Sequence, residues 1–179
     1  GMGGVGKTTY LTKFNNEFLE AQTNDFEVII WVTVTKDVNI TKIQEDISVR
    51  LGFSRPGQGP TLPGNEADRR DALYQALSRK KFLLLLDDLW EEPDLEKTGI
   101  PGPRENESKA KVVFTTRSKE VCVKMEAQKM LRVNFLDEEE SWELFSLKVG
   151  AEVDLNSSPS LRPLAKTVIS GCGGLPLAL

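Results

Sequence analysis

The chain has 179 residues, of which 39% are apolar, enough to bury the core of one compact α/β unit. Its formal net charge is only −4 and opposite charges are interspersed, so nothing in the charge pattern indicates a nucleic-acid groove or an anionic membrane as partner. The longest apolar run, 82–86, is far below the roughly 18 residues of a membrane helix. Without histidine or CxxC spacing, Cys122 and Cys172 are expected to be reduced thiols of a cytoplasmic protein.

The first half of the chain predicts helices and strands in alternation. Leu11, Phe14 and Phe18 recur at helical spacing, whereas the β-branched and nearly all-apolar segment 26–34 is typical of a strand covered on both faces. The predicted elements are a helix from the first loop to about residue 21, a strand over 26–34, a helix between Asn39 and Gly52, a Pro- and Gly-rich mobile loop over 53–64, and a helix over about 65–79.

The second half continues the alternation and then turns helical. We expect strands over 82–88 and 111–116, an irregular connector over 91–108, a short helix capped by Ser118, and a short strand over 131–134. Asp137 and Glu140 form a capping box for a further helix, and Ser158 with Pro159 begins the last one. This order predicts a parallel sheet with helices on both faces, followed by a helical piece.

Residues 1–8, GMGGVGKT, satisfy the phosphate-loop pattern G-x-x-x-x-G-K-[ST] in full, and a helix is predicted directly after them. Lys7 is expected to reach the β- and γ-phosphates, Thr8 to offer its hydroxyl to Mg²⁺, and Thr9 to face the α-phosphate. The alternative, a glycine-rich turn that binds nothing, fits this context poorly. The loop amides expected around the phosphates belong to Gly1, Met2, Gly3, Gly4, Val5 and Gly6.

Two acids follow the apolar strand 82–86, at the end of a parallel strand where nucleotide lies. Asp87 is the candidate for holding Mg²⁺, and Asp88 for orienting or deprotonating the attacking water. Alone, such a pair would more often be a helix cap or a solvated turn, but the phosphate loop favours the functional interpretation.

Two further residue types allow more than one interpretation. Arg117 follows the strand 111–116, so its guanidinium could read a γ-phosphate or form a plain surface ion pair. Trp31, Trp90 and Trp142 could stack on a base, but each lies in or beside an apolar segment, and core packing is the better interpretation for all three.

Six blocks, in this order, resemble the successive conserved blocks of the plant NB-ARC domain: GMGGVGKTT, FEVIIWVTV, KFLLLLDDLW, KVVFTTRS, FLDEEESWELF and GCGGLPLAL. The resemblance covers the whole chain, from the phosphate loop to the GLPL block. Trp90 after the two acids and Trp31 in its block resemble the coiled-coil branch of these disease-resistance proteins rather than the Toll-receptor-like branch.

The resemblance implies a P-loop NTPase fold of the signal-transducing ATPase type, with nucleotide-binding residues 1–134 and the start of a helical ARC subdomain in 135–179. The family's first strand precedes the phosphate loop, so the chain is expected to lack it and to fold poorly alone. The upstream signalling region and the leucine-rich repeats would lie outside the chain.

The resemblance further implies a switch in a plant immune receptor, held inactive by ADP, activated by ATP and reset by slow hydrolysis. It assigns Asp88 and Arg117 to hydrolysis and γ-phosphate sensing, Asp87 and Thr8 to Mg²⁺, and places Pro176 near adenine. The implied partners are the receptor's own coiled-coil and repeat regions, a pathogen effector or guarded host protein, and an active-state oligomer.

Two departures and two alternatives remain. Tyr10 stands where the family usually has an aliphatic residue, and the family's Met-His-Asp block lies beyond residue 179. A turnover ATPase or kinase could use the same lysine and acids, but neither an acceptor lid nor an ABC-type signature loop is found. A scaffold that binds no nucleotide is disfavoured by the intact motifs.

Overall fold

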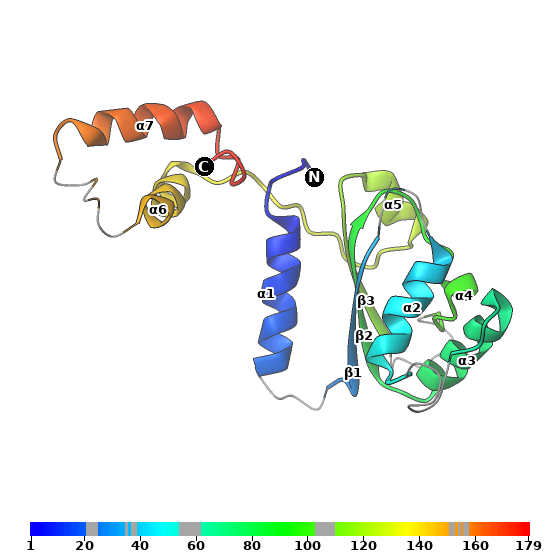
Figure 1. Cartoon of the computed structure of the whole chain (residues 1–179). Helices are drawn as coiled ribbons and strands as arrows, with labels where there is room; N and C mark the ends of the chain where they lie inside the picture. The colour runs from blue at the N-terminus through cyan, green and yellow to red at the C-terminus, as the bar shows by residue number, and fades with distance from the viewer. Residues whose placement is uncertain are drawn as a thin grey trace. The chain divides into compact units, whose positions relative to one another are not determined.

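The computed structural model divides the chain into two compact units, one made of Gly1–Lys7 with Lys129–Leu179 and the other of Thr8–Gln128. Each is described by itself. Figure 1 follows the chain through both units. The residues that the structure describes are 1–20, 25–34, 36, 39–53, 62–102, 110–150, 153, 155 and 158–179.

The larger unit is an α/β unit, and the smaller unit carries the last two helices of the chain. Strands and helices alternate as the sequence predicts. In the larger unit the elements are α1 (Lys7–Glu20, whose first residue belongs to the smaller unit), β1 (Val28–Thr33), α2 (Ile40–Arg50), α3 (Glu66–Ser78), β2 (Phe82–Leu89), α4 (Leu95–Thr98), β3 (Ala110–Thr116) and α5 (Lys119–Lys124). In the smaller unit they are α6 (Glu138–Val149) and α7 (Leu161–Cys172).

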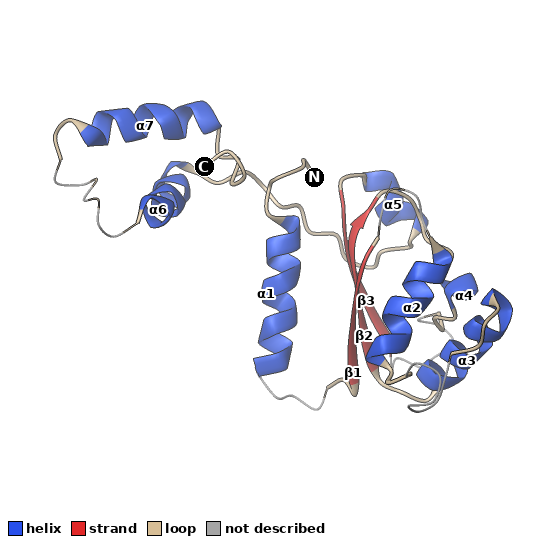
Figure 2. Cartoon of the chain, in the orientation of Figure 1, coloured by secondary structure: helices blue, strands red, loops and turns tan. Residues whose placement is uncertain are grey.

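The described strands form one parallel sheet in the order β1-β2-β3 (Figure 2). Central strand β2 is buried along almost its whole length, since five consecutive apolar residues from Phe82 to Leu86 face helices on one side or the other. A continuous apolar run is what a strand covered on both faces requires. The predicted parallel sheet with helices on both faces is therefore confirmed.

Two hydrophobic clusters lie on the opposite faces of this sheet. Phe82, Leu84 and Leu86 of β2 pack into the larger cluster, which also contains residues of α2, α3 and α5. Leu83 and Leu85 point the other way and meet Leu11 of α1. In Figure 1 α1 accordingly lies on one side of the sheet and α2 to α5 on the other.

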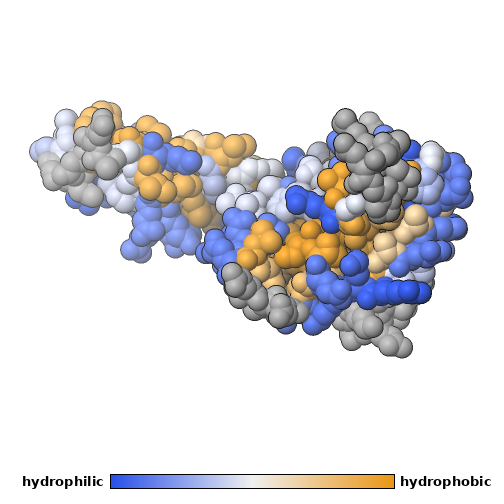
Figure 3. Space-filling view, turned by 60° about the horizontal axis from the view of Figure 1, so that its bottom comes forward, coloured by the Kyte–Doolittle hydropathy of each residue, from blue (hydrophilic) through white to orange (hydrophobic). Residues whose placement is uncertain are grey.

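The α1 side is covered more thinly than the other. Among the described residues, three of its cluster are buried, namely Leu11, Leu83 and Leu85. Partly buried side chains pack against them: Phe14, Phe18, Phe26, Ile29, Trp31 and Val113. Figure 3 shows hydrophobic surface on one face of the larger unit, bordered by hydrophilic atoms. No helix in the described ranges is both long and apolar enough to cross a membrane.

Predicted helix caps form the expected hydrogen bonds. Asn39 accepts from the backbone N–H of Lys42, and Ser118 from that of Glu120. Asp137 and Glu140 make the reciprocal capping box at 2.9 and 3.0 Å. The last helix begins slightly later than predicted, at Leu161, whose N–H lies 3.4 Å from the Ser158 hydroxyl oxygen.

Two predicted segments differ from the structure. The strand expected over 131–134 is wrong: these residues have no regular structure, since the described part of their unit offers no strand to pair with. The connector 91–108 contains helix α4, capped by Asp94 and ended by Gly99 at φ 81°. Residues 54–61 of the predicted mobile loop and 103–108 of the connector lie outside the described residues.

Candidate functional site

The loop before α1 takes a backbone shape that depends on its glycines. Gly4 and Gly6 have φ values of 76° and 96°, a region that side-chain-bearing residues rarely adopt. Helix α1 begins at Lys7, where the motif requires a helix. The Lys7 ammonium donates to the carbonyl oxygen of Met2 at 2.8 Å, and that of Gly1 lies 3.4 Å away.

A turn near residue 177 packs against this loop within the smaller unit. The Leu177 N–H donates to the Gly4 carbonyl oxygen at 3.2 Å, and a Cβ atom added to Gly4 would lie 2.7 Å from the Leu177 Cβ. A second backbone hydrogen bond holds the start of this turn: the Leu136 N–H donates to the Gly174 carbonyl oxygen at 2.8 Å. Half-buried Pro176 precedes Leu177 in this turn. The local sequence does not predict the backbone contact of this turn with the glycine loop, because the two segments lie at opposite ends of the chain.

In the larger unit, Thr8 in the first turn of α1 meets the end of β2. Its hydroxyl donates to Asp87 Oδ1 at 3.0 Å, and the Thr115 hydroxyl donates to the same oxygen at 2.6 Å. Asp87 is 5% exposed, and among the residues that the structure describes it is the only buried side chain of a charged type. The sequence motifs give Thr115 no role, and its contact with Asp87 becomes visible only where β3 pairs with β2 in parallel.

This group of oxygens suits Mg²⁺. Magnesium prefers hard oxygen ligands and is usually held by one or two carboxylates together with phosphate oxygens and water. Thr8 and Asp87 supply a hydroxyl and a carboxylate within hydrogen-bonding distance of each other. No cluster of three His, Cys, Asp or Glu residues that could hold a metal ion occurs among the described ranges.

Asp88 leaves the regular strand geometry. Its φ is 58°, and the pairing of β2 with β3 shifts register between Leu86 and Leu89. The Asp88 N–H donates to Thr115 Oγ1 at 2.9 Å, while the Thr116 hydroxyl donates to the Leu89 carbonyl oxygen at 2.7 Å. At this irregularity Asp87 is buried, whereas Asp88 is only half-buried and lies toward the surface.

The Asp88 carboxylate contacts both Arg117 and Trp90. Arg117 Nε donates to Oδ1 at 3.3 Å, and Trp90 Nε1 donates to Oδ2 at 3.2 Å. The Arg117 guanidinium lies 4.8 Å from the centre of the Trp90 ring, with the Lys36 ammonium 5.8 Å from it. Core packing is confirmed for Trp31 but wrong for Trp90, which is 43% exposed and bound to charged groups.

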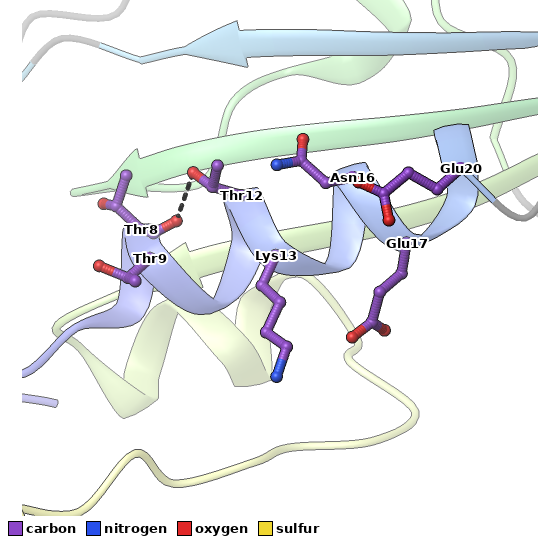
Figure 4. Close-up of a pocket in the computed structure, with 7 residues that line it drawn as sticks. All are labelled: Thr8, Thr9, Thr12, Lys13, Asn16, Glu17 and Glu20. Atoms are coloured by element: carbon purple, nitrogen blue, oxygen red, sulfur yellow. Dashed lines mark hydrogen bonds between the residues drawn. The ribbon is translucent and has the colours of Figure 1, made fainter.

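Thr9 and the exposed side of α1 line a shallow groove, drawn in Figure 4. Thr12 donates to the Thr8 carbonyl oxygen at 2.9 Å, a contact within the helix. Two carboxylates, Glu17 and Glu20, lie at the far end of the groove and would repel phosphate. Thr8 and Thr9 lie at the other end of the groove, in the first turn of α1 directly after the glycine loop. Tyr10 is 64% exposed, so the departure at this position does not disturb a core.

Comparison with known proteins places this geometry in a family. The NB-ARC domain matches residues 1–155. The chain belongs to the NB-ARC family. NB-ARC is a nucleotide-binding domain, in agreement with the phosphate loop and with the Thr8–Asp87 contact.

Several Arabidopsis thaliana proteins are similar to the NB-ARC chain over its whole length. A probable disease resistance protein is 48% identical over 180 residues, and the match covers 100% of the chain and 20% of that protein. The disease resistance proteins UNI and SUMM2 are both 46% identical to the chain over 179 residues. Each match covers 100% of the chain, together with 20% of UNI and 19% of SUMM2. The chain thus spans about a fifth of these relatives.

Proposed function

We propose that this NB-ARC chain is the Mg²⁺-dependent ADP/ATP-binding switch of a plant immune receptor. The contact between the Thr8 hydroxyl and Asp87 Oδ1 carries the proposal, because it joins the last residue of the phosphate-loop motif to the acid at the end of β2. Thr8 and Asp87 would hold a Mg²⁺ ion at this point, and the cation would supply positive charge to the phosphates of the nucleotide. The family match and the complete motif support the same assignment.

In this proposal the phosphate loop binds the phosphates through its amides. Lys7 moves from the Gly1 and Met2 carbonyl oxygens to the β- and γ-phosphates, Thr9 faces the α-phosphate, and Pro176 packs near adenine. The helix N-terminus at α1 adds partial positive charge to the loop. When bound, Mg²⁺ neutralises the charge that develops on the phosphates.

Hydrolysis is assigned to the half-buried acid Asp88 and its arginine partner. Asp88 orients the attacking water or accepts its proton, and Arg117 binds the γ-phosphate. The Arg117–Asp88 ion pair at 3.3 Å supports this assignment, since a γ-phosphate can compete with the carboxylate for the same guanidinium. ATP can therefore change contacts that ADP leaves intact.

A switch requires unequal binding to two states. A ligand shifts a conformational equilibrium only by its difference in affinity for the two forms, so the γ-phosphate must favour the active form by about a few kcal/mol. We propose that ADP stabilises the resting form and that ATP stabilises the active form. Slow hydrolysis of ATP to ADP then returns the protein to the resting form.

The biological setting follows from the relatives. Their names as disease resistance proteins support a role in plant defence, and Trp31 and Trp90 favour the coiled-coil branch. We assign residues 1–134 to the nucleotide-binding domain and 135–179 to the start of the ARC subdomain of a longer, cytoplasmic receptor. Its coiled-coil and leucine-rich-repeat regions, an effector or guarded host protein, and an active-state oligomer are the proposed partners.

Equilibrium binding of ADP and ATP to the full-length protein tests the proposal. Lys7→Ala should lower the affinity for both ADP and ATP at least about a hundredfold, because a charged contact with the phosphates is lost in a partly desolvated loop. Lys13→Ala removes an equal charge two turns along the same helix and should leave affinity unchanged. Tight binding that survives Lys7→Ala would contradict the phosphate-loop assignment.

A further inference from the structure

Three side chains at the end of β2 and β3 form a closed set of contacts. Asp88 touches Arg117 through Oδ1 and Trp90 through Oδ2, and Arg117 and Trp90 stack on each other at 4.8 Å. Each member therefore contacts both others. The phosphate-loop and acid motifs assign roles to Asp88 and Arg117, but they give none to Trp90.

The backbone alone does not fix the Asp88 carboxylate. Asp88 lies at φ 58° beside a register shift, and its own N–H is used by Thr115. A side chain that leaves an irregular strand position toward the surface is held only by what its oxygens bind. Here two donors hold it: a charged one, Arg117, and a neutral one, Trp90.

These two donors differ in what a nucleotide would do to them. The guanidinium carries a charge and would be drawn to a γ-phosphate, whereas the indole N–H is neutral and has no comparable attraction to it. If Arg117 moved to the phosphate, Oδ1 of Asp88 would become free while Oδ2 stayed bound to Trp90. The carboxylate would then keep its orientation at the moment when it is needed.

We infer that Trp90 is a positioning residue for hydrolysis, holding Asp88 by Oδ2 so that Oδ1 faces the attacking water once Arg117 binds the γ-phosphate. The inference rests on the proposed hydrolytic function. In the step itself, the water oxygen forms a bond to the γ-phosphorus, the bond from phosphorus to the β–γ bridging oxygen breaks, and ADP leaves. The water proton passes to Asp88 Oδ1 and then to the released phosphate or to solvent.

Trp90→Phe separates the two contacts of the indole. Phenylalanine keeps an aromatic face for Arg117 but has no N–H for Asp88. Trp31→Phe is the matched control, since Trp31 also donates its indole N–H to a side chain two residues away, Thr33 Oγ1 at 3.3 Å. Trp31 packs against the hydrophobic cluster between α1 and the sheet. It belongs to the same unit as Trp90, so each substitution removes one indole hydrogen bond from that unit.

The experiment is single-turnover hydrolysis of Mg-ATP by the full-length protein, with nucleotide affinity measured on the same samples. We expect Trp90→Phe to lower the hydrolysis rate about tenfold, as for loss of a hydrogen bond to a charged group, with ADP and ATP affinity within about twofold of the original protein. Trp31→Phe should leave both quantities unchanged. In an Asp88→Asn background, Trp90→Phe should cause no further loss, because the two residues act as one unit.

The outcomes separate this inference from the function on which it rests. An unchanged hydrolysis rate in Trp90→Phe, or an equal loss with and without the Asp88 carboxylate, would overturn the positioning role alone. A parallel fall in affinity and rate would show that Trp90 supports the fold instead, and would also overturn it. A wild-type protein that binds no nucleotide, or binds ATP and forms no ADP, would overturn the proposed hydrolysis and this inference together.

Discussion

The hydroxyl group of Thr8 donates to Asp87 Oδ1 at 3.0 Å, joining residues 79 positions apart in the sequence. The contact brings the first turn of α1 to the end of β2, with Thr115 of β3 donating to the same oxygen. Three elements thus meet at one carboxylate oxygen of the larger unit. In our account Mg²⁺ binds here, and its ligands are already close before any phosphate oxygen arrives.

Thr8→Val tests this metal role, because valine keeps the shape of threonine but has no hydroxyl. We expect it to lower ATP affinity about tenfold in the presence of Mg²⁺ and far less in EDTA, as measured by titration with a fluorescent ATP. Thr12→Val removes the next hydroxyl on the same helix, which bonds only within α1, and serves as control. A loss of equal size in EDTA would show that Thr8 acts without the metal.

Asp88→Ala tests the direction of the switch. Without the carboxylate the protein should bind ATP, fail to hydrolyse it and remain in the active form, so that a plant cell expressing the full-length variant shows a defence response without a pathogen. The nucleotide content and the response should be measured in parallel. A variant that is folded, loaded with ATP and silent would mean that ATP does not define the active state.

Arg117→Ala tests recognition of the γ-phosphate. Removal of the guanidinium should lower the affinity for ATP about tenfold and leave the affinity for ADP nearly unchanged. The reason is that only ATP has the γ-phosphate that Arg117 is proposed to bind. Competition titrations of the two nucleotides measure this ratio. Lys119→Ala removes an exposed cation two residues later and should not change it. Equal weakening of ADP and ATP would contradict the sensor role.

Two glycines should respond to alanine in opposite directions. Gly99 ends α4 at φ 81°, and a Cβ atom there would lie 2.5 Å from the Arg70 carbonyl oxygen. Gly99→Ala should therefore lower the free energy of unfolding by about 2 kcal/mol or more. Gly171 lies in α7 with open space around it, and Gly171→Ala should gain about 1 kcal/mol from helix propensity. Amide hydrogen exchange of peptides from each helix would resolve both effects locally.

The sequence predicted best those features whose cause is local. Strand β2 follows from an apolar run, and the capping box of Asp137 and Glu140 from residues three apart. Thr8, Asp87, Asp88 and Arg117 were predicted as functional residues from motif and strand position, and the structure brings Thr8 to Asp87 and Arg117 to Asp88.

Features that depend on distant parts of the chain were missed. The backbone hydrogen bond from Leu177 to Gly4 joins opposite ends of the sequence. The positive φ of Asp88 accompanies a register shift in the pairing of β2 with β3. Trp90 was assigned to the core because apolar residues precede it, yet Lys36 and Arg117 from two other segments lie over its ring, and its N–H donates to Asp88. The strand predicted over 131–134 lacks a pairing partner in its unit, which no local pattern reveals.

The central claim is tested most directly by identifying the nucleotide released when the purified, unstimulated full-length protein is denatured. The account predicts close to one ADP per protein molecule, lost in Lys7→Ala but retained in Lys13→Ala. A folded protein that releases no nucleotide would contradict a resting switch and favour a turnover enzyme or a scaffold instead.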